Sequence, residues 1–128
     1  MNPEFLDMDD VLAIHQRQLI RFGGSAGLRD ANLLDSAIAQ PRAQFGGEFL
    51  HTDLWEMAAA YLFHIVKNHP FVDGNKRTGL VTALAFLGIN GVSIPSESPR
   101  FYDVTMAVAE GTLDKAGLTV ILRELAGG

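Results

Sequence analysis

The chain has 128 residues, of which 48% are hydrophobic, 20% charged and 9% aromatic, so a single globular domain over residues 1–128 is expected rather than a disordered chain. It has no cysteine, which excludes disulfides, thiolate metal sites and cysteine nucleophiles. Ten basic and 15 acidic residues give a net charge of −5, so nucleic acid is not expected as a direct ligand.

The first half of the chain divides into two predicted helices. Residues 1–10 are acidic and have no apolar run behind a basic start, so they do not resemble a secretory signal. Apolar residues then recur at helical spacing from Val11 to Phe22, and a pair of glycines ends this helix. A second helix is predicted to begin after Asp30 and to end at Pro41. Residues 46–51 are predicted to form a loop.

The second half is predicted to hold four more helices. Thr52 is the expected cap of a third helix, whose apolar stripe runs through residues 54–65. A fourth helix, residues 75–90, is apolar on nearly every side, which is typical of the buried centre of a bundle. Residues 99–110 and 114–125 are the last two helices. The predicted fold is therefore all-α: a single-domain bundle of about six helices around a buried central helix.

No apolar stretch approaches the roughly 20 residues that are needed to cross a bilayer. Together with the missing secretory signal and the missing cysteines, this favours a cytoplasmic protein that does not contact a membrane.

Most of the polar chemistry lies in residues 69–77, His-Pro-Phe-Val-Asp-Gly-Asn-Lys-Arg, just before and at the start of the fourth helix. Backbone N–H groups at a helix start bind anions, and Lys76 and Arg77 add positive charge there. Cations are unfavourable at this end of a helix, so a phosphate chain is the expected partner. Asp73 offers an oxygen ligand for Mg²⁺, and His69 can take a proton near neutral pH. The segment predicts phosphoryl or nucleotidyl transfer.

A purely structural interpretation of these residues is also open. Asp73 would then cap the fourth helix, Asn75 would form an Asx turn, and Lys76 and Arg77 would be solvated at a surface turn. His69 would be an ordinary histidine at a helix C-terminus. Spacing alone does not decide between the two interpretations, because short motifs often match by chance.

Other candidate residues lie outside this segment. Trp55 and Tyr61 are spaced like core aromatics, although either is also a candidate to flank a nucleotide base. His64 lies five residues before His69, the wrong spacing for a metal pair, so it is expected to pack or to hydrogen-bond. No P-loop or protein-kinase motif is present, which excludes those folds. Three arginines are predicted to lie on a solvated face: Arg17, Arg21 and Arg29.

Residues 69–77 resemble the signature of the Fic/Doc (Fido) superfamily, which reads His-x-Phe-x-Asp/Glu-Gly/Ala-Asn-Gly/Lys-Arg. Two upstream stretches, Gly-Leu-Arg-Asp at residues 27–30 and Ala-Ile-Ala-Gln-Pro at residues 37–41, resemble the Doc, or death-on-curing, branch. The resemblance covers most of residues 5–125 and implies the small helical Fido fold. It also implies that His69 is the general base for a target hydroxyl, that Phe71 anchors the loop, and that Asp73 binds Mg²⁺.

The remaining motif positions concern the nucleotide. By the resemblance, the backbone at Gly74 and Asn75 forms the anion hole, and Lys76 and Arg77 hold the phosphates of ATP. Members that transfer AMP usually have glycine at the position of Lys76 and a second arginine at the position of Leu80. Both departures are similar to the Doc branch, whose members are understood as kinases that move the terminal phosphate of ATP to a threonine of translation elongation factor Tu.

The resemblance thus implies a toxin of a toxin–antitoxin system that blocks translation by phosphorylating a protein with ATP and Mg²⁺. It implies two protein partners, a translation elongation factor as the target and an antitoxin with a disordered tail that folds on binding. Two alternatives are open: an AMP transferase acting on a protein hydroxyl, and an inactive helical interaction module. The intact base, metal ligand and cations argue against the inactive module.

Overall fold

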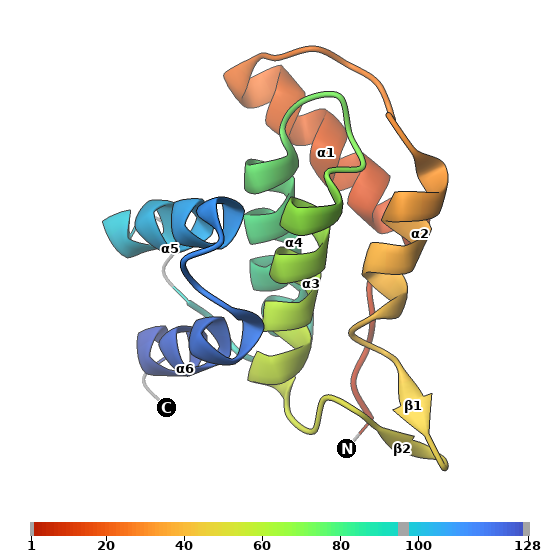
Figure 1. The fold of residues 1–128 in the computed structure, drawn as a ribbon, viewed down its shortest axis with the longest axis vertical. Helices are drawn as coiled ribbons and strands as arrows, with labels where there is room; N and C mark the ends of the chain where they lie inside the picture. The colour runs from red at the N-terminus through yellow and green to blue at the C-terminus, as the bar shows by residue number, and fades with distance from the viewer. Residues whose placement is uncertain (1, 95–97, 127–128) are drawn as a thin grey trace.

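The computed structural model describes residues 2–94 and 98–126 (Figure 1). Within them, six helices and one small hairpin follow in chain order: α1 (Met8–Phe22), α2 (Ala31–Ala39), β1 (Gln44–Phe45), β2 (Glu48–Phe49), α3 (Leu54–Asn68), α4 (Asn75–Ile89), α5 (Pro99–Glu110) and α6 (Lys115–Leu125). The predicted all-α fold is confirmed. No helix in the described ranges has both the length and the apolar character needed to span a membrane.

The helix starts show why one of them is unusual. In all helices but α4, a side chain at the N-cap accepts a hydrogen bond from a backbone N–H of the first turn; these caps are Asp7, Asp30, Asp53, Ser98 and Asp114. The prediction of Thr52 as the cap of α3 was wrong by one residue, because the Thr52 hydroxyl donates to the Glu56 carboxylate instead. Helix α4 begins after Gly74, and no described side chain caps it.

The predicted loop at residues 46–51 contains part of a short antiparallel hairpin. Gln44 pairs with Phe49 and Phe45 with Glu48, and Gly46 and Gly47 form the turn with φ values of 60° and 81°. Two glycines at positive φ suit a tight hairpin turn. Each strand has only two residues, too few to produce the alternation by which a strand is recognised in a sequence.

Two helices share the centre of the molecule. Helix α3 packs against α2, α4, α5 and α6, and α4 packs against α1, α3 and α5. Figure 1 shows α3 and α4 side by side, with α1 and α2 on one side and α5 and α6 on the other. Gly79 permits close approach of α4 to α3, because a Cβ there would lie 3.0 Å from Val66 Cγ2 and 3.3 Å from the Leu62 carbonyl oxygen.

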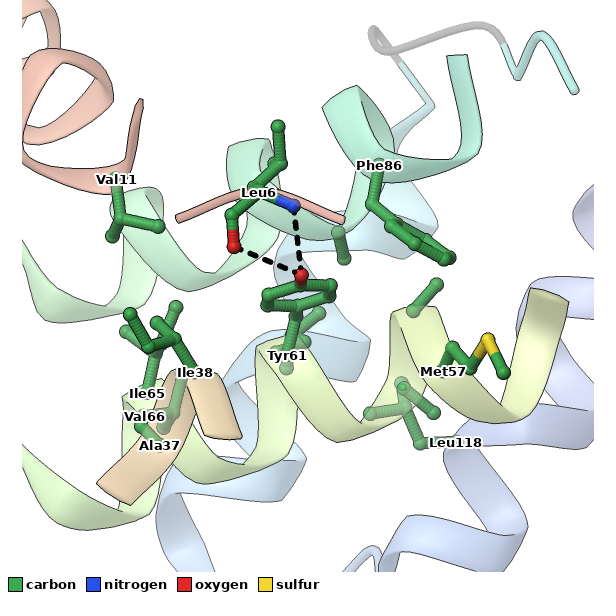
Figure 2. Close-up of a cluster of buried hydrophobic side chains, with 14 of the residues drawn as sticks. Leu6, Val11, Ala37, Ile38, Met57, Tyr61, Ile65, Val66, Phe86 and Leu118 are labelled. Carbon is green, nitrogen blue, oxygen red and sulfur yellow. Dashed lines mark hydrogen bonds between the residues drawn. The ribbon is translucent and has the colours of Figure 1, made fainter. Parts of the chain in front are cut away.

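The buried core continues to the N-terminal segment through Tyr61. Its ring is fully buried, and its hydroxyl accepts a hydrogen bond from the Leu6 N–H at 2.9 Å and donates to the Leu6 carbonyl at 3.1 Å (Figure 2). Burial raises the pKa of Tyr61 to about 12, so the phenol stays neutral. Residues before α1 are thereby fixed against the centre of the bundle.

Candidate active site

The loop between α3 and α4 begins where His69 ends α3. His69 has left-handed backbone angles (φ 52°, ψ 55°), and its N–H donates to the Ile65 carbonyl at 3.1 Å. The Arg29 guanidinium binds the end of the same helix: Nε donates to the His69 carbonyl at 2.7 Å and Nη2 to the Asn68 carbonyl at 3.0 Å. A cation at a helix C-terminus satisfies free carbonyls and stabilises the helix dipole. The His69 backbone is therefore held firmly, while its side chain is exposed.

The segment joining α1 to α2 runs beside this loop. The Pro70 carbonyl accepts from the N–H groups of Arg29 at 2.7 Å and Asp30 at 3.0 Å, and the Val72 N–H donates to the Gly27 carbonyl at 3.0 Å. Gly27 has a φ of 131°, and a Cβ at this position would lie 3.1 Å from Val72 Cγ2. Figure 1 shows this connection next to the α3–α4 loop, far from it in sequence. The Gly-Leu-Arg-Asp stretch is thus a clamp on the loop.

Phe71 and Asn75 fix the middle of the loop. Phe71 is 1% exposed, and its ring stacks on His15 of α1 with centroids 3.7 Å apart and planes 7° apart. The buried Asn75 side chain accepts from the Phe71 N–H and donates to the Phe71 carbonyl, both at 2.9 Å. His15 Nε2 lies 2.8 Å from the Asp73 carbonyl oxygen, which only accepts, so Nε2 carries the proton.

The Asp73 carboxylate is held by backbone donors. Oδ2 accepts from the Ser25 N–H at 3.1 Å and Oδ1 from the Gly74 N–H at 2.9 Å. These two hydrogen bonds, Ser25 first, hold the pKa of Asp73 below its usual range, and the charges of Arg77 and His15 act in the same direction. Asp73 is therefore ionised at neutral pH. It does not cap α4, because its Gly74 bond is made to the residue before the first turn.

A cleft of about 950 Å³ lies between the loop, α1, α4 and α5. Six of the seven predicted site residues line it: His69, Asp73, Gly74, Asn75, Lys76 and Arg77. Phe71, the seventh, lies in the core beneath them. The opposite walls are largely apolar and come from α1, α4 and α5; they include Phe22, Leu80, Leu84, Phe101, Tyr102 and Met106. The side of α4 that does not pack on α3 thus lines the cleft, which explains why this helix has no polar face.

The positive charges of the cleft have no carboxylate partners among the described residues. Lys76 and Arg77 are exposed and form no ion pair there. The Arg77 guanidinium carbon lies 4.1 Å from the centre of the Phe22 ring, and that of Arg21 lies 5.1 Å from it. Phe22 and Tyr102 line the cleft but were not predicted from the sequence. Arg21 and Arg29 were predicted to lie on a solvated face, which their exposure fits, but their contacts with the site were not predicted.

Two aromatic residues considered for the nucleotide base are elsewhere. Tyr61 is fully buried in the core, and Trp55 lies near Arg123, 5.6 Å from the guanidinium carbon. Neither lines the cleft, so neither is placed to flank a base bound there. Their helical spacing indicated a core, and the core is where they pack. His64 accepts a hydrogen bond from the Lys115 ammonium at 3.0 Å, in line with the expected packing or hydrogen-bonded role.

Known proteins similar to this chain identify its family. A family model described as the Fic/DOC family matches residues 5–87, which include the whole loop. The chain is 42% identical over 126 residues to a protein of Mycolicibacterium smegmatis named toxin Doc, covering 97% of this chain and 92% of that protein. It is 35% identical over 119 residues to the protein kinase doc of Escherichia phage P1, covering 93% of each. The chain belongs to the Fic/DOC family.

Proposed function

We propose that this protein is the toxin of a toxin–antitoxin system and acts as a protein kinase that transfers the terminal phosphate of ATP to a hydroxyl of a target protein. The proposal is supported by the names of the two relatives, one a toxin and the other a protein kinase. The observation that carries it is the convergence in one cleft of a histidine, a carboxylate, a helix N-terminus and two cations that form no ion pair with any described residue.

The start of α4 is suited to hold the phosphates. The first-turn N–H groups point out of an uncapped helix end, and Gly74 at a φ of 80° gives close access to them. Lys76 and Arg77 stand at the same end, where an anion removes their unfavourable interaction with the helix dipole. A guanidinium also grips two phosphate oxygens at once.

The Asp73 carboxylate fits a magnesium ion that is shared with phosphates. It is ionised and exposed, and each oxygen has one lone pair left after its backbone hydrogen bond. The described residues contain no group of three or more histidine or acidic side chains that could hold a metal alone. Mg²⁺ commonly takes one carboxylate together with phosphate and water oxygens, and it neutralises charge that develops on the phosphates.

His69 is the proposed general base. Its nitrogen takes the proton from the target hydroxyl as that oxygen bonds to the terminal phosphorus. The bond from this phosphorus to the bridging oxygen breaks, ADP leaves, and the imidazolium returns its proton to solvent. Arg29 and Ile65 fix the backbone of His69. Little conformational entropy is therefore lost when the imidazole turns to the substrate.

Phosphate transfer is favoured over AMP transfer by two positions of the cleft. Lys76 adds bulk and charge at the anion hole, where AMP-transferring members have glycine. Leu80 lines the cleft, so the position of their second arginine supplies no charge. The proposed target is a threonine of translation elongation factor Tu, and modification of this factor would block translation.

The test is transfer from ATP labelled at either the α- or the γ-phosphate, with cell extract and with purified elongation factor as acceptors. Label from the γ position alone, with a mass gain of one phosphate on a threonine, supports the proposal. Label from the α position identifies an AMP transferase. Label from neither position, in an extract where the factor is intact and Mg²⁺ is present, contradicts an enzyme and leaves an interaction module.

The proposed regulator is an antitoxin with a disordered tail that folds as a helix on this domain. Co-expression of each neighbouring gene tests it, with growth and gel filtration as readouts. Suppressed toxicity together with a stable complex is the expected outcome. A protein that is harmless in growing cells and binds neither neighbouring product is not a toxin of this kind.

A further inference from the structure

The last two residues of α1 form an aromatic and cationic pair at the edge of the cleft. Arg21 and Phe22 both line it, and Phe22 is 48% exposed, although it is a large apolar side chain. The Phe22 ring contacts two guanidinium groups, with centroid distances of 4.1 Å to Arg77 and 5.1 Å to Arg21. Both distances are within the roughly 6 Å over which a cation is attracted to an aromatic face.

This arrangement brings like charges together. Arg21 and Arg77 come from different helices, and neither forms a hydrogen bond or an ion pair with another described side chain. Lys76 adds a third cation, whereas Asp73 is the one acidic residue among those lining the cleft. The cleft is therefore positive in a protein whose net charge is −5. Such a concentration of charge is favourable when a polyanion occupies the cleft.

We propose that Arg21 is an additional phosphate-binding residue and that Phe22 is a positioning residue which holds Arg77 toward the phosphates. The inference rests on the proposed function, since it takes ATP as the occupant of the cleft. It assigns a role in the site to α1, which lies outside the nine-residue motif. The aromatic face limits the positions of a long side chain, so less entropy is lost when Arg77 grips phosphate oxygens.

Arg21 also has a simpler possible role, which is to stabilise α1, and this role predicts a different result. A basic residue in the last turn of α1 stabilises that helix through its dipole. If this were its whole role, replacing Arg21 would lower stability slightly and leave nucleotide affinity unchanged. If Phe22 instead stacked on the base, its loss would weaken adenosine as much as ATP.

The experiment measures equilibrium binding of ATP with Mg²⁺, and of adenosine, by calorimetry. The variants are Arg21→Gln, Phe22→Leu and Phe22→Tyr, with Arg17→Gln as the matched control on an exposed part of α1 outside the cleft. We expect Arg21→Gln to weaken ATP about tenfold, as expected for loss of a charged hydrogen bond. Phe22→Leu should weaken ATP about three- to fivefold, Phe22→Tyr should restore it, and adenosine affinity should not change.

A double-mutant cycle separates positioning from direct contact. In an Arg77→Ala background, Phe22→Leu should cause little further loss of ATP affinity, because the ring acts through that guanidinium. Equal losses in both backgrounds, or unchanged ATP affinity in Arg21→Gln, would overturn the inference while leaving the kinase proposal in place. A wild-type protein that binds no ATP would overturn both. Melting temperatures close to that of the wild type exclude misfolding as the cause.

Discussion

The described part of the molecule has two hollows that contain histidine and positive charge, and they differ in how those groups are satisfied. The larger is the cleft at the start of α4. The smaller, about 460 Å³, is lined by residues of the hairpin region, α3 and α6: Leu50, His51, Glu56, Lys115, Ala116, Thr119 and Arg123. Either hollow, judged by its titratable residues alone, resembles a functional site.

In the smaller hollow most charged groups have partners. The Lys115 ammonium donates to His64 at 3.0 Å, Arg123 donates to Asp53 at 2.7 Å, and Glu56 accepts from the Thr52 hydroxyl at 2.7 Å. In the cleft, by contrast, Lys76 and Arg77 have no carboxylate partner among the described residues. Charge without a partner at a helix start, rather than the presence of histidine and lysine, therefore distinguishes the proposed ligand site from the smaller hollow.

The largest difference between the two hollows is expected when their histidines, His69 and His64, are replaced. His69→Asn should lower phosphate transfer by about 10²–10⁴-fold, the usual contribution of a general base. Asparagine tolerates the left-handed backbone that His69 adopts, so the fold should survive. His64→Gln is the matched control and should transfer at the wild-type rate. A folded, fully active His69→Asn protein would remove His69 from the chemistry.

The second largest effect is expected at the carboxylate. Asp73→Asn keeps an oxygen for one of the two backbone donors but loses the charge and the second oxygen, so transfer should fall about 100-fold or more at limiting Mg²⁺. Titration of activity with Mg²⁺ should show a higher midpoint than in the wild type, and a chelator should abolish transfer in both. The control is Asp35→Asn on the exposed side of α2. Transfer that resists chelation would contradict the metal role.

The third effect is expected on stability, when the side chain of Asn75 is removed. Asn75→Ala removes both hydrogen bonds to Phe71 and leaves its buried N–H and carbonyl unsatisfied. We expect the free energy of unfolding to fall by about 2 kcal/mol, measured by urea denaturation. Asn32→Ala, on the exposed start of α2, should change it by less than about 0.5 kcal/mol. An equal effect of both substitutions would show that the two hydrogen bonds between Asn75 and Phe71 do not contribute to stability.

The smallest expected effect is on the pH dependence of stability, through His64 beside the smaller hollow. Burial, with the charges of Lys115 and His51, lowers the pKa of His64 to about 4 from 6.5. The unfolded chain therefore binds more protons in this range, and His64 costs stability progressively as the pH falls from 6.5 to 4. His64→Gln keeps an acceptor for Lys115 but does not titrate. Between pH 6.5 and 4, the free energy of unfolding of this variant should fall by about 1 kcal/mol less than that of the wild type. This figure is smaller than the full pKa shift would give, because His64 is partly exposed to solvent. Parallel pH profiles of the two proteins would contradict a lowered pKa for His64.

The sequence was sufficient for the helices and for the grouping of the loop residues. Helical spacing and capping residues such as Asp30 are local signals, and residues 69–77 are contiguous, so their convergence required no knowledge of the fold. Contacts between distant segments were not predictable in this way. From the sequence, Arg29 was predicted to lie on a solvated face, and only the folded structure shows its hydrogen bond to the His69 carbonyl. Phe22 was read as the end of an apolar stripe, because nothing local indicates that Arg77 lies over its ring.

The contacts around position 69 are made through the backbone of the α3–α4 loop. Arg29 binds main-chain carbonyls of residues 68 and 69, and Pro70 and Val72 are likewise held through their backbones. This scaffold does not use the imidazole, so a side chain that tolerates the left-handed backbone, such as asparagine, can replace it. A chain without the imidazole should thus remain a faithful binding form of the protein. We expect such a form to accumulate in growing cells without harm and to serve as bait for the proposed nucleotide, target and antitoxin.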